Sequence, residues 1–351
     1  MEGRGPEELE RLLEEARKVR GNSLWKDAMR RFRRHGAARF ALRFLLALSF
    51  LCLFTPLLPF APPARVRLSE QFQPPKAVFV RHGWSRGDYP GASGLTGRML
   101  DLRERIFGDL EFGPWMGTDS KGRCLMSRIL WGGRVSLMVG LVATLVSLIV
   151  GVVYGALSGF LGGFWDDLMM RIVDVLYAVP FIFVVIFLIT VIRENQEVLE
   201  ATFGLTRMGV FFLVIGLVYW LTMARVVRGQ VLSLKNREFI EAARVLGAST
   251  PRILFRHLVP NVVSVVLVYL TLTIPRVMLF EAFLSFLGLG VEAPDVSWGM
   301  LAADGLGAVN PVRVYWWFVL FPSLALGATL LALNFVGDGL RDALDPRLRE
   351  R

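Results

Sequence analysis

Hydrophobic residues occur along this chain in long uninterrupted blocks, which polar and charged segments separate. Six blocks carry few charges and approach or exceed the roughly 18 residues needed to cross a bilayer core of about 30 Å. They cover residues 44–60, 135–157, 175–192, 208–224, 262–287 and 314–336. Because open sheet edges are not tolerated in lipid, blocks of this length predict helices. We therefore expect an all-α membrane protein with six transmembrane helices.

Composition agrees with this prediction. The chain is 54% hydrophobic with a mean hydropathy of +0.50, whereas soluble domains are about 45–50% apolar. The first block follows more than 40 residues rich in charge and is not followed by an A-x-A cleavage site, so it is interpreted as a retained helix rather than a signal peptide.

The distribution of Lys and Arg predicts the orientation in the membrane. Residues 1–43 hold 12 of them, residues 225–260 hold 7 and residues 338–351 hold 4, whereas 193–207 hold 2 and 286–313 hold 1. Segment 61–134 also holds 12, but loops of that length translocate largely regardless of charge. The predicted organisation is a cytoplasmic extension 1–43, a first transmembrane helix 44–60, an extracytoplasmic segment 61–134, a five-helix core 135–337 with a cytoplasmic loop 225–260, and a cytoplasmic tail 338–351.

The net charge of +10 favours a membrane surface over nucleic acid. The positive residues lie mostly beside the predicted spans rather than on one soluble face, and anionic lipid headgroups account for them. The two cysteines, Cys52 in the first span and Cys124 in the outer segment, are placed too differently to predict a disulfide.

The outer segment is expected to be mostly loop. It begins with "PFAPPARV", "QPPK" and "GDYPGASG", whose Pro and Gly residues are typical of turns. It ends in "GTDSKGRCLMSRILWGGRVSL", where Thr118 or Asp119 could cap a short amphipathic helix in the membrane interface before the second span.

Small residues repeat at four-residue spacing in the second span, at Gly151, Gly155 and Gly159. Such a stripe allows another helix to approach closely. Packing within the subunit is the prediction, and a pore-facing stripe is the alternative.

Three charged residues within the spans are candidates for the transport pathway: Asp174, Arg276 and Glu281. Asp174 lies near the interface, and a local ion pair with Arg171 three residues earlier is the alternative. Arg276 and Glu281 are five residues apart and do not share a helix face well. We expect each of them to meet a partner or water in a cavity.

The segment "REFIEAARVLGASTPRILFRHLVPN", residues 237–261, is unusually polar for its position between two spans. Gly247 stands where a left-handed helix cap belongs, Ser249 or Thr250 can cap a second helix, and Pro251 suits its first turn. The pattern predicts a helix, a glycine turn and a second helix. In the first helix, Glu238, Glu241 and Arg244 are expected on one face, and Phe239, Ala243 and Leu246 on another.

A compact knob of this kind suits a cleft in a partner protein. An interfacial helix held by lipid headgroups is the alternative.

This segment resembles the EAA loop of the permeases of ABC-type importers. The matching residues are Glu241, Ala242, Ala243, Gly247, Val259 and Pro260. Four further stretches are similar, in the same order, to the oligopeptide and dipeptide (OppC/DppC-like) branch: "SLWKDAMRRFRRHGAARFALRFLLALSFLCLFTPLLP", "GTDSKGRCLMSRILWGGRVSL", "EAFLSFLGLGVEAPDVSWGML" and "NFVGDGLRDALDPRLRE". The family usually has Asp where Cys124 stands, and residues 1–22 match no pattern.

The resemblance implies a type I ABC-importer permease fold in a prokaryotic inner membrane. It implies that the loop is a coupling helix docking in a groove of a separate ABC ATPase. The implied partners are a second, related permease, two ATPase subunits and an extracytoplasmic substrate-binding protein. The expected coupling residues are Glu241, Ala242, Ala243, Arg244, Leu246, Gly247, Ala248, Arg256 and Pro260, although Arg244 and Arg256 could instead contact headgroups.

The chain has no G-x-x-x-x-G-K-[ST] sequence. We therefore expect no catalytic residue, cofactor or metal in this subunit, with ATP and Mg²⁺ bound by its partners. The expected cargo is a di- or oligopeptide, but the sequence does not distinguish these from nickel or oligosaccharides. A gradient-driven transporter or channel is the alternative function, and it would favour paired acidic residues at mid-membrane, which the sequence lacks. A non-transporting scaffold is a third interpretation.

Overall fold

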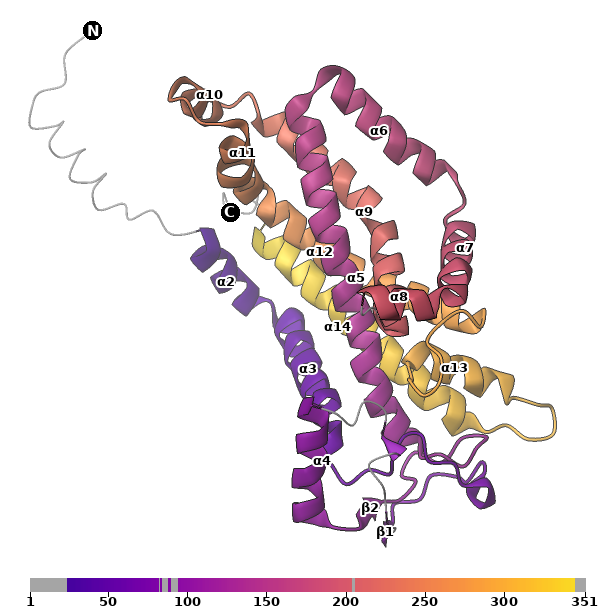
Figure 1. Ribbon diagram of the computed structural model, residues 1–351. Helices are drawn as coiled ribbons and strands as arrows, with labels where there is room; N and C mark the ends of the chain where they lie inside the picture. The colour runs from indigo at the N-terminus through magenta and orange to yellow at the C-terminus, as the bar shows by residue number, and fades with distance from the viewer. Residues whose placement is uncertain (1–23, 82, 84–87, 90–93, 204–205, 345–351) are drawn as a thin grey trace, which may run out of the picture.

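The computed structural model describes residues 24–81, 83, 88–89, 94–203 and 206–344, and it is predominantly helical (Figure 1). Five helices among these residues are long and apolar enough to cross a membrane, and a bent pair makes up to six. This confirms the predicted fold class. The five are α3 (Gly36–Leu53), α5 (Leu125–Leu161), α9 (Arg207–Leu234), α12 (Val259–Phe286) with the turns before it, and α14 (Trp316–Leu344).

The remaining elements are shorter and lie at the two ends of the bundle or beside it (Figure 1). The helices among them are α2 (Leu24–Arg34), α4 (Gly94–Phe107), α6 (Gly163–Ala178), α7 (Phe181–Glu194), α8 (Gln196–Phe203), α10 (Glu238–Val245), α11 (Thr250–Arg252) and α13 (Trp298–Gly307). Strand β1 (Phe79–Arg81) pairs antiparallel with β2 (Leu110–Phe112). In Figure 1, α10 and α11 lie at one end of the bundle and the two strands at the other.

The third predicted span, 175–192, is not one straight helix. Helix α6 ends at Ala178, α7 begins at Phe181, and the two are bent by 87°. Pro180 lacks the N–H that would continue the helix. A residue before proline is also pushed out of the helical region, and Val179 is accordingly extended, with φ −75° and ψ 128°.

Two helices begin before the predicted spans for a common reason. Helix α3 starts at Gly36, well before residue 44, and α5 starts at Leu125 after its cap, Cys124, instead of following a separate interfacial helix. Because polar residues occur at the start of both helices, the hydrophobicity pattern placed these starts outside the predicted spans. In α5 the charged Arg128 is fully buried, so its charge does not stop the helix.

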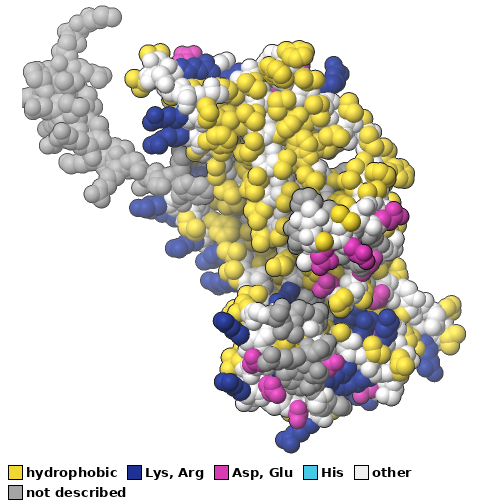
Figure 2. All heavy atoms as spheres, in the orientation of Figure 1, with side chains coloured by type: hydrophobic (Ala, Val, Ile, Leu, Met, Phe, Trp, Pro, Cys, Tyr) yellow, Lys and Arg dark blue, Asp and Glu magenta, His cyan; other side chains and the backbone are white. Residues whose placement is uncertain are grey.

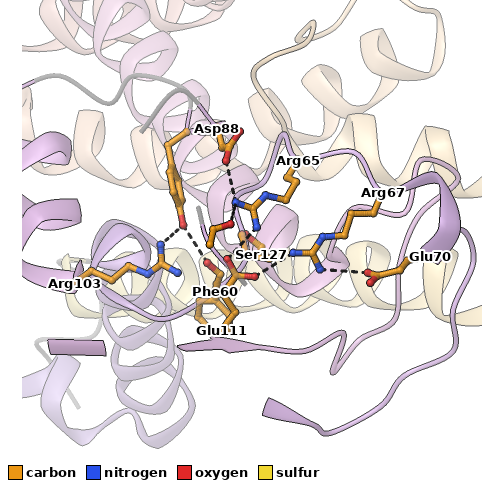
Figure 3. A network of polar contacts seen from close by, with 11 residues as sticks. Phe60, Arg65, Arg67, Glu70, Asp88, Arg103, Glu111 and Ser127 are labelled. Atoms are coloured by element: carbon orange, nitrogen blue, oxygen red, sulfur yellow. Dashed lines mark hydrogen bonds and ion pairs between the residues drawn. The ribbon is translucent and has the colours of Figure 1, made fainter. Parts of the chain in front are cut away.

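Most described residues between 61 and 124 lie outside helices and strands, as the Pro and Gly residues of this segment indicated, although α4 and the β1–β2 pair interrupt the loop. Most of "GDYPGASG" lies outside the described residues. Polar contacts hold the described part together as a cap, which we call the outer cap. Glu111 is 1% exposed and accepts hydrogen bonds from Arg65 and Arg67, each at 3.3 Å (Figure 3). Arg103, buried on α4, donates to the Tyr89 hydroxyl, which in turn donates to the Phe60 carbonyl at 3.2 Å. Ionic and hydrogen-bonded contacts therefore hold a segment whose regular secondary structure is interrupted.

Asp119 ties this cap to α5. Its Oδ1 accepts the backbone N–H groups of Lys121 and Arg123 at 2.8 and 2.9 Å. Its Oδ2 accepts from Arg123 Nε at 2.7 Å and from Arg128 Nη1 at 2.6 Å. Arg128 Nη1 also lies 3.7 Å from the carboxylate of Asp304 on α13. The buried Asp119 carboxylate thus joins the outer cap to α5, and Arg128 extends the contact to α13.

Cys124 follows this turn and takes the capping position of α5 without a side-chain hydrogen bond. Burial raises the pKa of its thiol to about 11, so the side chain is neutral at physiological pH. Both cysteines are free, as their positions in the sequence indicated.

The glycine stripe of α5 packs against α9. A Cβ on Gly151 would lie 2.6 Å from Met223 Cβ, one on Gly159 would lie 2.9 Å from the Arg228 carbonyl oxygen, and one on Gly155 would overlap the Ala224 carbonyl oxygen. The stripe therefore serves packing within the subunit, as predicted, and at Gly155 and Gly159 the two backbones approach closely.

Replacing Gly155 with alanine tests this contact. Alanine in a helix is more stable than glycine by about 0.5–1 kcal/mol. At this position, however, it forces a methyl group against α9, and overpacking costs about 1–3 kcal/mol. We expect Gly155→Ala to lower the melting temperature of the purified protein in detergent. Gly229→Ala is the matched control, because a Cβ there would meet nothing within 4 Å. Equal melting temperatures for the two variants would contradict the close contact.

Asp119→Asn tests the buried carboxylate. The substitution leaves Arg123 and Arg128 close together with no negative charge between them, and breaking a buried ion pair costs about 3–5 kcal/mol. We expect a large fall in the melting temperature and easier proteolysis of the outer cap. The exposed Asp109→Asn should change neither property. If Asp119→Asn also melts like the unmodified protein, Asp119 does not hold the cap to α5.

Candidate functional site

The polar segment 237–261 folds as a helix, a turn and a second helix at one end of the bundle (Figure 1). Gly247 has φ +77°, in the left-handed region. Its N–H donates to the Arg244 carbonyl at 2.9 Å, and the Ala248 N–H donates to the Ala243 carbonyl at 3.0 Å. These two bonds form a Schellman cap, so the predicted glycine turn is confirmed.

The second helix starts with Ser249 in the capping position and Pro251 in the first turn. It continues through a π-helical turn, η4 (Ile253–Leu258), directly into α12. There is no flexible linker between the turn after Gly247 and the membrane helix, so a displacement of the turn is passed to α12.

The buried face of α10 consists of Ile240, which is fully buried, and Ala243. Of the predicted apolar face of Phe239, Ala243 and Leu246, Ala243 alone belongs to this buried face, and the other two are exposed, as residues that enter a partner's cleft would be. Phe239 is 42% exposed and Leu246 is 86% exposed. The helix ends at Val245, so the helical period no longer applies at Leu246.

Two adjacent apolar side chains at the tip of the loop face outward. Val245 is 87% exposed and Leu246 is 86% exposed. Among the other predicted coupling residues, Ala243 is buried and Ala248 half-buried, and those that are exposed are Glu241, Ala242, Arg244, Gly247, Arg256 and Pro260. The guanidinium of Arg244 also lies 5.7 Å from the centre of the Phe160 ring of α5. The tip is thus an apolar pair surrounded by charged groups.

The opposite side of the loop is part of a core shared with three long helices. Ile240 and Ala243 cluster with Leu254 and Leu258, with Val231 of α9, and with Ala156 of α5 and Val262 of α12. A loop packed in this way cannot move without displacing the helices beneath it.

An ion pair close to this core extends the connection to α6. Arg228 of α9 donates to both carboxylate oxygens of Asp166, through Nε at 2.6 Å and Nη2 at 2.7 Å. Ser158 of α5 donates to the same carboxylate. Lys235, at the end of α9, donates to the Gly159 carbonyl at 3.0 Å. The bidentate geometry fixes α6 to both α5 and α9.

The structure gives the pathway candidate Asp174 a different partner from the one the sequence suggested. Its carboxylate lies 2.9 Å from Arg225 Nη2 of α9, so the local pair with Arg171 is replaced by a contact between helices. The Arg225 guanidinium also stacks over the Tyr177 ring, 4.2 Å from its centre.

The other two candidates do not lie in one site. Arg276 is exposed, and its carbonyl accepts from the Tyr219 hydroxyl at 3.2 Å. Glu281 is fully buried, and its Oε1 accepts from Ser285 at 2.9 Å and from Ser297 at 2.7 Å. Glu281 thus holds the start of α13 against α12. A role of these residues in lining a pathway stays a prediction.

Sequence reasoning did not identify Asp166, Arg225, Arg228 or Val245. The first three lie near the ends of hydrophobic blocks, and Asp166 is 62 positions from Arg228, so no local pattern relates them. Val245 stands beside Leu246 and could have been found from its position next to the glycine cap. Among the described residues, no group of three or more His, Cys, Asp or Glu side chains could hold a metal ion.

Comparison with known proteins agrees with the resemblance noted in the sequence. Residues 151–350 match the family model of the binding-protein-dependent transport system inner membrane component, and residues 23–75 match that of the N-terminal TM domain of oligopeptide transport permease C.

Three relatives extend the match over most of the chain. The oligopeptide transport system permease protein OppC of Escherichia coli strain K12 is 44% identical over 331 residues, covering 94% of each chain. OppC of Bacillus subtilis strain 168 is 39% identical over 93% of this chain and 91% of its own length. The dipeptide transport system permease protein DppC of the same strain is 38% identical over 67% of this chain and 69% of its own. The chain therefore belongs to the family of binding-protein-dependent transport inner membrane components, in its branch of oligopeptide and dipeptide permeases.

Proposed function

We propose that residues 237–261 are the loop through which this peptide-importer permease is driven by a separate ATP-hydrolysing subunit. The observation that carries the proposal is the exposed pair Val245 and Leu246, on a loop whose other face is packed into α5, α9 and α12. Burying two adjacent exposed apolar side chains in a protein cleft is favourable, because it removes apolar surface from water. The packed face provides the route from that cleft to the membrane helices.

The remaining exposed residues of the loop would complete the interface. Glu241 and Arg244 stand beside the apolar tip, and Arg256 and Pro260 follow on the second helix. The charged side chains among them would orient the partner protein and disfavour binding of proteins whose charges do not match. Gly247 sets the angle between the two halves, and a Cβ at this position would meet no atom within 4 Å.

The transport cycle follows from this mechanical connection. Closure of two ATPase subunits, which bind ATP and Mg²⁺, would displace the loops of this permease and of a second, related permease. Through Ile240 and the Asp166–Arg228 pair, the displacement would tilt α9, α12 and α6 together. The pathway between the two permeases would alternate between two states, and an extracytoplasmic binding protein would deliver a di- or oligopeptide to the outward-open one.

Affinity purification of the chain from its native membrane tests this assembly directly. We expect a second permease and ATPase subunits in the eluate, with vanadate-sensitive ATP hydrolysis. A chain that elutes alone and transports peptide in liposomes without ATP would instead support a gradient-driven carrier.

Gly247→Val tests the shape of the loop. A β-branched residue is strained at φ +77°, but a Cβ there meets nothing within 4 Å, so the effect is confined to the turn. We expect normal membrane insertion and reduced peptide-stimulated ATP hydrolysis.

Gly288→Val is its matched control, because Gly288 has φ +74°, an equally empty surrounding and the same two cap hydrogen bonds at the other end of α12. ATPase subunits should copurify normally with this control. If Gly247→Val retains full peptide-stimulated ATP hydrolysis, the turn is not the docking element.

Val245→Ser together with Leu246→Ser tests the apolar tip. Because both side chains are more than four-fifths exposed, the melting temperature of the permease should not change. Loss of interface anchors costs about 2 kcal/mol or more, so ATPase subunits should dissociate during purification or bind at least about tenfold more weakly. Val312→Ser, at an 88% exposed position near the opposite end of the molecule, should leave ATPase binding unchanged. Undiminished binding by the double variant would exclude the tip as an anchor.

A further inference from the structure

Helix α2 carries a basic face that the coupling mechanism does not use. Four basic residues lie on one side of the helix, because their spacing in the sequence matches the helical period. They are Lys26, Arg30, Arg33 and Arg34. All four are exposed, and with Met29 they line a shallow open depression. Figure 2 shows dark blue side chains along the edge of the molecule where α2 and α3 lie in Figure 1.

The opposite face of α2 fixes the helix in place. Ala28 is buried, and the Phe32 ring lies beside Gly339 of α14, which also touches Ala38 of α3. His35 separates α2 from α3 and caps the second helix, its Nδ1 accepting from the Ala38 N–H at 3.1 Å. The basic face is therefore held outward and cannot turn into the bundle.

The four basic side chains have no acidic partner in the part of the chain that the structure describes. The ion pairs among those residues include none from Lys26, Arg30, Arg33 or Arg34. Asp27 is the one acidic residue on α2, so the face keeps a strong positive charge. Four cations held on one rigid surface favour an anionic ligand.

We propose that this face binds the phosphate groups of anionic phospholipids in the cytoplasmic leaflet. Helix α2 leads directly into the span α3, at the end of the chain predicted to be cytoplasmic, so the cations lie at headgroup level. Arg matches phosphate oxygens with its planar fork, and basic residues beside a span are attracted to anionic lipid. Met29 and the 74% exposed Phe40 at the start of α3 provide apolar surface for the acyl chains. The proposal does not depend on the cargo or on the docking loop.

The test uses the full-length permease with its copurifying subunits in nanodiscs of equal parts phosphatidylglycerol and phosphatidylcholine. After re-extraction in mild detergent, mass spectrometry gives the ratio of the two lipids retained. We expect several-fold enrichment of phosphatidylglycerol by the unmodified protein. K26Q/R30Q/R33Q/R34Q should remove most of that enrichment. Raising the salt from about 0.1 M to about 1 M shortens the Debye length from about 10 to about 3 Å and should have the same effect.

The control variant removes four exposed cations elsewhere. R81Q/R98Q/R105Q/R313Q changes the net charge equally, at exposed positions outside α2, and should keep the enrichment. An excess of inorganic phosphate should not displace the lipid, and displacement would assign the face to a soluble phosphate. The proposal is overturned if the α2 variant retains full enrichment or the control loses as much. It is also overturned if the α2 variant loses its ATPase subunits, because the face would then be a protein-binding surface.

Discussion

The close approach of α5 and α9 is the contact on which the rest of the subunit depends. At Gly155 and Gly159 the α5 backbone lies directly against backbone carbonyls of α9, and at Gly151 it lies against the Met223 side chain; in lipid such close packing is a main source of helix association. The outer cap is attached at one end of α5, and the 237–261 loop packs against α5 and α9 at the other.

The two ends of this pair are held by different kinds of interaction. At the outer end, Asp119 receives four hydrogen bonds from nearby donors and is fully buried, so the cap is fixed by charge and geometry. At the other end, Ile240 and Leu258 pack into an apolar core, which permits movement of a whole unit while contacts are kept. A polar, hydrogen-bonded attachment therefore holds one end of this multi-pass inner-membrane permease, and an apolar packed core holds the other.

The sequence predicted features with short-range causes. Gly247, Pro251 and the glycine stripe were identified because caps, first turns and helix contacts depend on residues within one or two turns. The sequence did not predict features whose causes are distant. Helix α5 continues through Arg128 because Asp119 neutralises the charge of Arg128, and hydropathy alone cannot predict that contact. Val245 was not identified beside the predicted coupling residue Leu246, although it stands next to the glycine cap. Asp166 and Arg228 meet only through the packing of α5 on α9.

The turn at Gly247 has a consequence for binding energetics. Its two cap hydrogen bonds lie within the loop, and no neighbouring atom lies within 4 Å of where a Cβ would be. The shape of the tip is therefore set by its own backbone, before any partner arrives. A preorganised segment loses little conformational entropy on association. In the proposed docking, more of the free energy gained by burying Val245 and Leu246 would therefore remain available to move the membrane helices.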